Sequence, residues 1–190
     1  MDPILFPTRQ SIITLQDITV DNWQHIVHLV VNKDQLTLVP PNVESLCEHQ
    51  FFLPHSIVKA IYADSTPVGY LRVQQVQEAC APATVSATTI STDQISTLSG
   101  TYQMKCFMID KACQGLGFGT KALKLLLALS TTPASWEDKA VTNSLTTATI
   151  RVLTAPFATV HSDDSPEHFF ASVGFIKDAT GKEMVWASRP

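Results

Sequence analysis

Apolar and polar residues alternate along several short segments of this chain, as is typical of β-strands with two different faces. The clearest segment, residues 102–109, reads YQMKCFMI and places Tyr102, Met104, Cys106 and Met108 on one face. The turn sequence DSTP separates two of the other segments and predicts an antiparallel hairpin early in the sheet. Apolar, β-branched runs predict these further strands at residues 11–19, 56–63, 68–73 and 148–153, and a closing hairpin at residues 175–177 and 183–187.

Helical periodicity lies between these strands. Residues 118–129 follow a glycine-containing turn directly and repeat apolar residues at helical spacing. Shorter helices are predicted over residues 23–31, from Val43 with Asn42 as the N-terminal cap, and over residues 166–174. Strands and helices therefore succeed one another irregularly, which predicts an α/β (α+β) fold with a mixed sheet.

Two segments lack a clear period. The Ser/Thr-rich residues 77–100 are predicted to form an insert or an irregular extension of neighbouring strands, and Ser135 is a candidate cap for a short extra helix.

The chain has 190 residues, of which 45% are hydrophobic and 16% charged, and this suits one domain with a sizeable core. We therefore expect a single domain over residues 1–190.

Charge and cysteine content argue against several classes of function. The formal net charge of −4 and the lack of Lys or Arg runs argue against nucleic-acid binding. The four cysteines form no CxxC pair and have no histidines at zinc-ligand spacing, so no metal site is expected. The N-terminus does not resemble a signal peptide, and no apolar run approaches membrane length. These features predict a soluble, cytoplasmic protein without a membrane partner.

The sequence QGLGFG, residues 114–119, connects the strand ending in FMID to the helix behind it. A helix N-terminus carries unpartnered backbone N–H groups and partial positive charge, and glycines let the backbone approach a ligand closely. The glycines at positions 115, 117 and 119 fit neither the Walker A loop GxxxxGK nor the dinucleotide fingerprint GxGxxG. Residues 114–119 are therefore predicted to form a phosphate-binding turn of another kind.

Five segments of the chain, taken in order, resemble one family. The chain is similar to the GNAT superfamily of N-acetyltransferases, in particular its spermidine and diamine N-acetyltransferase branch, at ITVDNWQHIVHL, QLTLVPPNVESL, TPVGYL, FMIDKACQGLGFGTKALKLL and FFASVGF. The resemblance implies a mixed, mostly antiparallel sheet flanked by helices and splayed at its central strand for acetyl-CoA. It also implies acetyl transfer to a primary amine, most readily a polyamine or another small amine.

The resemblance further implies which residues bind acetyl-CoA. The backbone of Phe107, Met108 and Ile109 is expected to pair with the pantetheine arm. Backbone N–H groups of the turn are expected to hold the pyrophosphate, with the residues Gln114, Gly115, Leu116, Gly117, Phe118, Gly119 and Thr120. Leu116 stands where relatives often carry Lys or Arg, so one favourable charge contact is missing. Asp163 matches a position, usually Asn, that contacts pantetheine.

Acetyl transfer in this family proceeds by direct attack of the amine on the thioester. The Met108 N–H is the candidate for stabilising the oxygen that gains negative charge. Many relatives use a tyrosine to protonate the leaving thiolate, but the matching residue here is Phe170, which has no proton to give. His161, His168 and Tyr102 are alternative proton donors, and water is a further alternative.

The acceptor amine has three candidate contacts. These are Trp23 on the first predicted helix and Glu44 and Glu48 on the second. The two glutamates are four residues apart and share a helical face, which is either an acidic wall for an amine or a solvated surface. A small-molecule amine is the expected partner, a protein amine is the alternative acceptor, and GNAT enzymes often form homodimers. An acyl-CoA-binding module with weak or no turnover is the rival function, because of Phe170 and Leu116.

Overall fold

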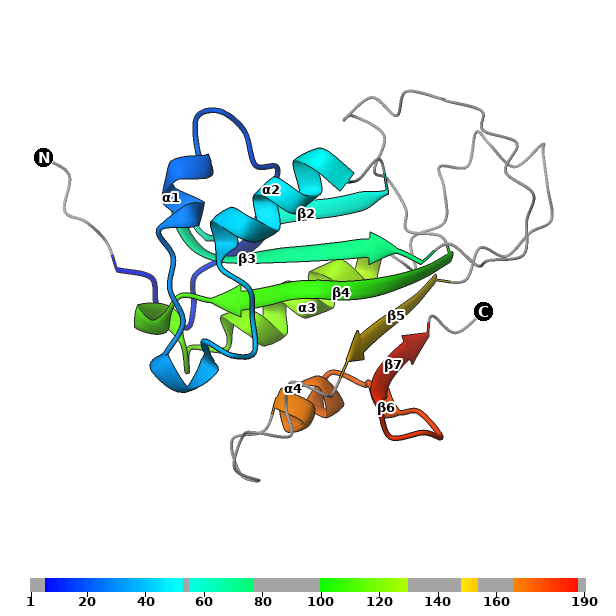
Figure 1. The fold of residues 1–190 in the computed structure, drawn as a ribbon. Coiled ribbons are helices and arrows are strands. Elements are labelled where there is room, and N and C mark those ends of the chain that lie inside the picture. Colours follow the sequence, from blue (N-terminus) through cyan, green and yellow to red (C-terminus); the bar gives the residue numbers. More distant parts are fainter. Residues whose placement is uncertain (1–5, 53–54, 77–99, 130–147, 154–165, 188–190) are drawn as a thin grey trace, which may run out of the picture.

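The computed structural model describes residues 6–52, 55–76, 100–129, 148–153 and 166–187. They form a seven-stranded sheet in the order β1-β2-β3-β4-β5-β7-β6 (Figure 1). Its strands are β1 (Ile13–Gln16), β2 (Ser56–Ala63), β3 (Thr66–Gln75), β4 (Gly100–Ile109), β5 (Ala148–Leu153), β6 (Ile176–Lys177) and β7 (Glu183–Ala187). Neighbouring strands are antiparallel except β4 and β5, which run parallel. The predicted mixed, mostly antiparallel sheet is confirmed.

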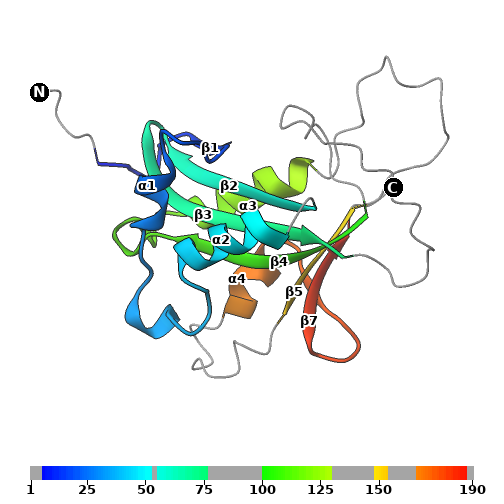
Figure 2. The ribbon, with the colours of Figure 1, turned by 45° about the horizontal axis from the view of Figure 1, so that its top comes forward.

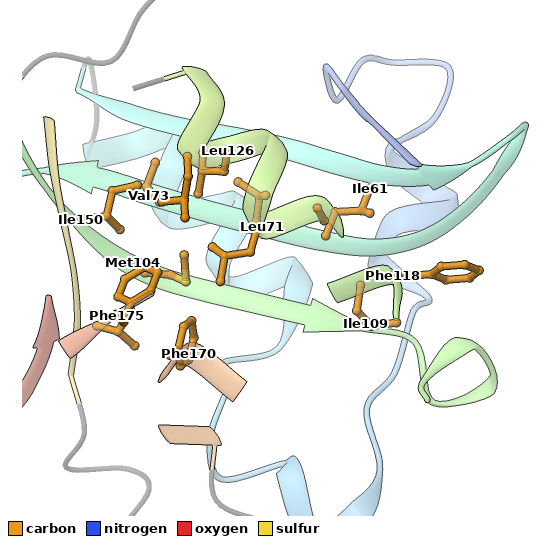
Figure 3. Close-up of a cluster of buried hydrophobic side chains, with 14 of the residues drawn as sticks. Ile61, Leu71, Val73, Met104, Ile109, Phe118, Leu126, Ile150, Phe170 and Phe175 are labelled. Atoms are coloured by element: carbon orange, nitrogen blue, oxygen red, sulfur yellow. The ribbon is translucent and has the colours of Figure 1, made fainter. Parts of the chain in front are cut away.

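Helices cover both faces of the sheet, with α1 and α2 on one face and α3 on the other (Figure 2). The helices are α1 (Trp23–Val27), α2 (Asn42–Phe52), α3 (Phe118–Leu129) and α4 (Pro166–Ser172), and two single turns are η1 (Lys33–Gln35) and η2 (Lys111–Cys113). Each face has its own apolar cluster. The larger cluster contains Leu126 of α3, Leu71 of β3 and Phe170 of α4, as Figure 3 shows.

A bulge in β4 changes which of its side chains face each cluster. The register with β3 leaves Lys105 as the extra residue between Met104 and Cys106. Tyr102 and Met104, before the bulge, are buried in the larger cluster, whereas Cys106 and Met108, after it, belong to the cluster beneath α1 and α2. The prediction that these four residues share one face is therefore wrong, because one extra residue reverses the alternation.

The first predicted strand and the first predicted helix are each about half as long in the structure. The first strand covers Ile13–Gln16 instead of residues 11–19, since its pairing with β2 is limited to those four residues. The first helix ends at Val27. Beyond it the chain turns away, because the Val30 N–H donates to the Asp110 carboxylate at 2.9 Å and not to a helical carbonyl.

Asn42 is the first residue of α2 and not its cap. Its side-chain Nδ2 donates to the Ile26 carbonyl at 2.9 Å and to the Leu29 carbonyl at 3.2 Å. The buried amide therefore ties α2 to the end of α1, and the predicted helix start at Val43 is one residue late. The predicted insert, apart from Gly100, and the helix predicted at Ser135 lie outside the described residues.

Candidate active site

Strands β4 and β5 diverge and leave a fork in the sheet. Their parallel pairing spans only residues 100–103 of β4 and 148–151 of β5. The remainder of β4 stays paired with β3, so its other edge is open toward β5. A cavity of about 530 Å³ occupies the fork, lined by residues 104–109 of β4 and by the last two residues of β5. The predicted splay beside the central strand is present in this geometry.

The cavity reaches both faces of the sheet. Its α3 half is lined by Met104, Phe107, Phe118, Gly119, Phe169 and Phe170. Its α1/α2 half is lined by Val31, Val39, Cys106 and Met108 of the smaller cluster and by Lys105, which interacts with Arg72 and with Glu48 of α2. The cavity therefore lies between side chains from both faces of the sheet.

The glycine-containing turn closes one end of the cavity. Gly115 and Gly117 have φ angles of 74° and 81°, in the left-handed region that disfavours side chains. A Cβ atom added at either position would meet nothing within 4 Å, so the backbone conformation, and not lack of space, requires glycine. The Lys121 N–H is bonded back to the Gly117 carbonyl at 3.2 Å. The N–H groups of the helical residues before Lys121 have no carbonyl acceptor within the helix. They are therefore suited to bind an anion.

The structure brings together most of the predicted cofactor residues. The cavity is lined by the turn residues Gln114, Gly115, Gly117, Phe118, Gly119 and Thr120. It is also lined by the predicted strand and helix residues Phe107, Met108, Ile109 and Phe170. Leu116 instead packs against the larger apolar cluster. Asp163 lies outside the described residues.

The open edge of β4 presents the backbone of Phe107 and Ile109. Asp110 donates its N–H to the Val68 carbonyl of the neighbouring chain segment at 2.8 Å. Backbone direction alternates along an antiparallel ladder, so Met108, two residues earlier, directs its N–H toward β3. The Ile109 carbonyl faces the other way, where it accepts a hydrogen bond from the turn. The candidate donors to an oxyanion are thus the N–H groups of Phe107 and Ile109, in place of Met108.

Gln114 connects the turn to the segment between α1 and α2. Its Nε2 donates to Gln35 Oε1 at 2.8 Å and to the Ile109 carbonyl at 2.9 Å, while its Oε1 accepts from Asn32 Nδ2 at 2.8 Å. Gln35 lines the cavity, and the sequence did not identify it. No local pattern marks this contact, because Asn32 and Gln35 are 82 and 79 residues from Gln114.

Two cations lie beside the turn. Arg9 Nη2 is 3.4 Å from the Gly115 carbonyl, and Lys121 Nζ donates to the carbonyls of Arg9 at 2.7 Å and Ser11 at 3.2 Å. Positive charge near the positive end of a helix is unfavourable unless an anion is also bound. The Asp64 carboxylate already lies near Lys121, so Arg9 is the cation of the two that is better suited to a phosphate. No pattern in the sequence marks Arg9, which is 106 residues from Gly115 of the turn.

Phe170 belongs to an aromatic cluster at the α3 half of the cavity. Its ring centroid lies 5.1 Å from that of Phe169, 5.4 Å from Phe175 and 6.4 Å from Phe107. The side chain is buried, so this position supplies only apolar surface to the cavity. His168, on the same helix, is exposed and is not among the cavity-lining residues.

Tyr102 lies in the core before the fork opens. It is opposite Ile150 of β5, and its side chain is buried in the larger cluster. Met108 is six positions further along the strand, which corresponds to ~20 Å. This placement does not support Tyr102 as a proton donor in the cavity. His161 lies outside the described residues.

The predicted acceptor contacts do not line the cavity. Trp23 begins α1 and is 43% exposed, and Glu44 is exposed on α2. Glu48 Oε2 accepts a hydrogen bond from Arg72 Nη2 at 2.5 Å, and Arg72 Nη1 donates to the Ser45 carbonyl at 2.7 Å. Arg72 is buried, and a buried guanidinium without a carboxylate partner is costly. Glu48 thus has a structural role in this ion pair.

Lys105 is the charged residue that the structure adds to the cavity. Among the described residues of the lining it is the single cation, and none of them is Asp or Glu. Partial burial and the positive charge of Arg72 lower the pKa of Lys105, while Glu48 opposes this. Burial raises the pKa of the neighbouring Cys106 to about 12, so this cysteine is a neutral thiol at physiological pH.

Within the described ranges, no cluster of His, Cys, Asp and Glu side chains is arranged to hold a metal ion. The helices of the same ranges are too short or too polar to span a bilayer.

Comparison with known proteins identifies the fold. The sequence matches no protein-family model and no curated protein. Solved structures match over most of their length, among them the following three. AtaTR bound with AcCoA is 14% identical, with a TM-score of 0.52 over 92% of this chain and 93% of that chain. A protein assigned to the GNAT family from Bacteroides thetaiotaomicron is 15% identical, with a TM-score of 0.51 over 93% and 87% of the two chains. An acetyltransferase from Thermus thermophilus is also 15% identical, with a TM-score of 0.50 over 93% and 96%. At these identities the fold alone is shared, and this chain has the GNAT acetyltransferase fold.

Proposed function

We propose that this protein is an acetyl-CoA-dependent N-acetyltransferase acting on a primary amine. The observation that carries the proposal is the cavity of about 530 Å³, which passes through the fork and ends at the glycine-containing turn. One compartment of that shape suits an elongated cofactor on the α3 side and an amine on the α1/α2 side. The fold that this chain shares with acetyltransferases supports the same interpretation.

The described residues suit the separate parts of acetyl-CoA. The first-turn N–H groups of α3, with Arg9 and Lys121 beside them, provide donors and positive charge for the pyrophosphate. The open edge of β4 can pair with the pantetheine amides as a neighbouring strand would. The apolar side chains of the α3 half then surround the thioester end and exclude water.

Acetyl-CoA supplies an activated thioester, which a neutral primary amine attacks to give an amide and free CoA. The N–H groups of Phe107 and Ile109 are positioned to stabilise negative charge on the carbonyl oxygen. An ammonium acceptor first loses a proton to a base or to water, because its ordinary pKa is about 10. With Phe170 at the tyrosine position, water is the simplest proton source for the departing thiolate.

Two measurements test the proposal. Titration calorimetry of the purified chain should show acetyl-CoA binding at one site per chain, and a thiol-release assay over a panel of amines should show acceptor-dependent CoA formation. An absence of acetyl-CoA binding would refute the proposal.

A second function is favoured by Phe170. Because this buried side chain cannot donate a proton, the same cavity would also serve a module that binds acyl-CoA with little turnover. Acetyl-CoA binding without thiol release on any acceptor would identify the module, and sustained thiol release would exclude it.

The resemblance in sequence favours a polyamine or another small amine as the acceptor. The Glu48 carboxylate is already paired with Arg72, so Glu44 is the remaining acidic candidate on that helix. An unchanged KM for spermidine in a Glu44→Ala variant would remove this contact from the acceptor site. An intact protein tested as substrate in the same assay would examine the alternative of a protein amine.

A further inference from the structure

We infer that the acceptor carries a carboxylate or similar anionic group near its amine, and that Lys105 binds this group. The inference rests on the proposed function and names the class of acceptor. It concerns the α1/α2 half of the cavity, defined above by Val31, Val39, Lys105, Cys106 and Met108.

The bulge in β4 determines the position of Lys105. As the extra residue in the register with β3, it lies where β4 leaves its pairing with β5 and the fork opens. Phe107, whose N–H faces the open edge, is two residues further along the strand. A group held by Lys105 is therefore next to the point at which the acceptor and the thioester would meet.

Lys105 is a cation without a carboxylate partner in the described chain. Its Nζ is hydrogen-bonded to the neutral side chain of Gln103. The nearby charges of Arg72 and Glu48 offset one another in their ion pair, so the local balance is one positive charge. Arg72 Nε is buried without a hydrogen-bond partner, which leaves further positive potential beneath the strand.

The other residues of this half indicate the remainder of the acceptor. Val31, Val39 and Met108 are apolar, and Cys106 is a neutral thiol. An apolar body is stabilised by contact with such side chains. A second ammonium group, as in the polyamine that the resemblance in sequence favours, would be repelled by Lys105, so the residues of this half argue for a different small amine. An amino acid with an apolar side chain, or a compound of the same chemistry, meets both requirements.

The test compares acceptors that differ mainly in charge. Thiol release would be measured with leucine, with leucinamide and with a diamine of similar length. We expect leucine to have the highest kcat/KM, by about fivefold to tenfold over leucinamide, the size expected for one partly exposed ionic contact. The amine of the amide is the less basic of the two and is neutral to a larger extent at the assay pH, so every rate and kcat/KM is expressed per concentration of neutral amine.

Three variants assign the preference to Lys105. Lys105→Met should abolish the preference for leucine, and Lys105→Glu should invert it in favour of the diamine. Lys124→Glu makes the same charge change at an exposed position of α3 outside the lining and should preserve it. Calorimetry with acetyl-CoA should give similar affinities for the wild-type chain and all three variants.

The outcomes separate this inference from the proposed function. Two results, each with normal acetyl-CoA binding, would overturn the inference alone. The first is equal rates for leucine and leucinamide. The second is a rate that Lys105→Met lowers equally for every acceptor. The second result would assign Lys105 to proton transfer instead. If acetyl-CoA did not bind to the wild-type chain, the proposed function and this inference would both be overturned.

Discussion

Replacing Gly117 by alanine tests directly whether the glycine-containing turn is a phosphate-binding turn. Gly117 has a φ of 81°, and a Cβ atom there would meet no atom within 4 Å. The substitution therefore creates no clash and acts only on the backbone conformation. An alanine held in the left-handed region costs about 1–2 kcal/mol. If the turn relaxes to avoid this cost, its N–H groups no longer converge on one anion.

Gly181 provides a matched control within the same chain. It lies in the turn between β6 and β7, with a φ of 70° and again no atom within 4 Å of an added Cβ. The two alanine variants should lose similar stability, and for a domain of this size their melting temperatures should fall by about 2–8 °C. Only the variant in the phosphate-binding turn should also lose affinity for acetyl-CoA.

The assay is titration calorimetry at a temperature where both variants are fully folded, as judged by circular dichroism. We expect Gly117→Ala to weaken acetyl-CoA binding about tenfold or more, the equivalent of one or two lost charge-assisted hydrogen bonds. Gly181→Ala should bind as the wild type does. Equal affinities for the two variants would show that the turn does not hold the phosphates, whatever their stabilities.

Three further predictions concern other parts of the site. Arg9→Ala should weaken acetyl-CoA binding about fivefold because it removes a cation beside the turn. Lys182→Ala removes an exposed cation far from the turn in sequence and should leave the affinity unchanged. Equal affinities of the two variants for acetyl-CoA would show that Arg9 is not part of the site. Phe170→Tyr should raise kcat in the thiol-release assay several-fold by restoring a proton donor, and an unchanged kcat would show that thiolate protonation does not limit the rate. At about pH 8.5 iodoacetamide should modify the exposed Cys47 but not Cys106, because at that pH a thiol with a pKa of about 12 stays protonated; rapid labelling of Cys106 in the folded protein, detected by peptide mass spectrometry, would contradict its burial.

Local sequence patterns predicted the strand, the glycine-containing turn and the helix at the centre of the fold. The period changes from two to that of a helix at the turn, and the structure places β4 and α3 on either side of it. The fork also followed from the resemblance, since it is a property of the whole fold. Each of these features spans many residues, so small errors in register do not remove them.

The features that the sequence did not predict depend on single residues or distant contacts. The bulge at Lys105 has no distinctive residue type, yet it reverses the faces of β4 and moves the candidate N–H donors away from Met108. Arg9 and Gln35 reach the site only through the tertiary fold. Glu48 has the spacing of a substrate contact, but the buried Arg72, far along the chain, takes its carboxylate.

The fork has a consequence for kinetics. The proposed function places the cofactor in the α3 half of the cavity and the amine in the α1/α2 half, so neither ligand has to leave before the other enters. Direct transfer then requires a ternary complex, and initial-rate plots against one substrate at fixed levels of the other should intersect and not run parallel. A single compound that joins the two ligands through a narrow linker would have to thread the gap between β4 and β5, and its affinity would report the width of that passage.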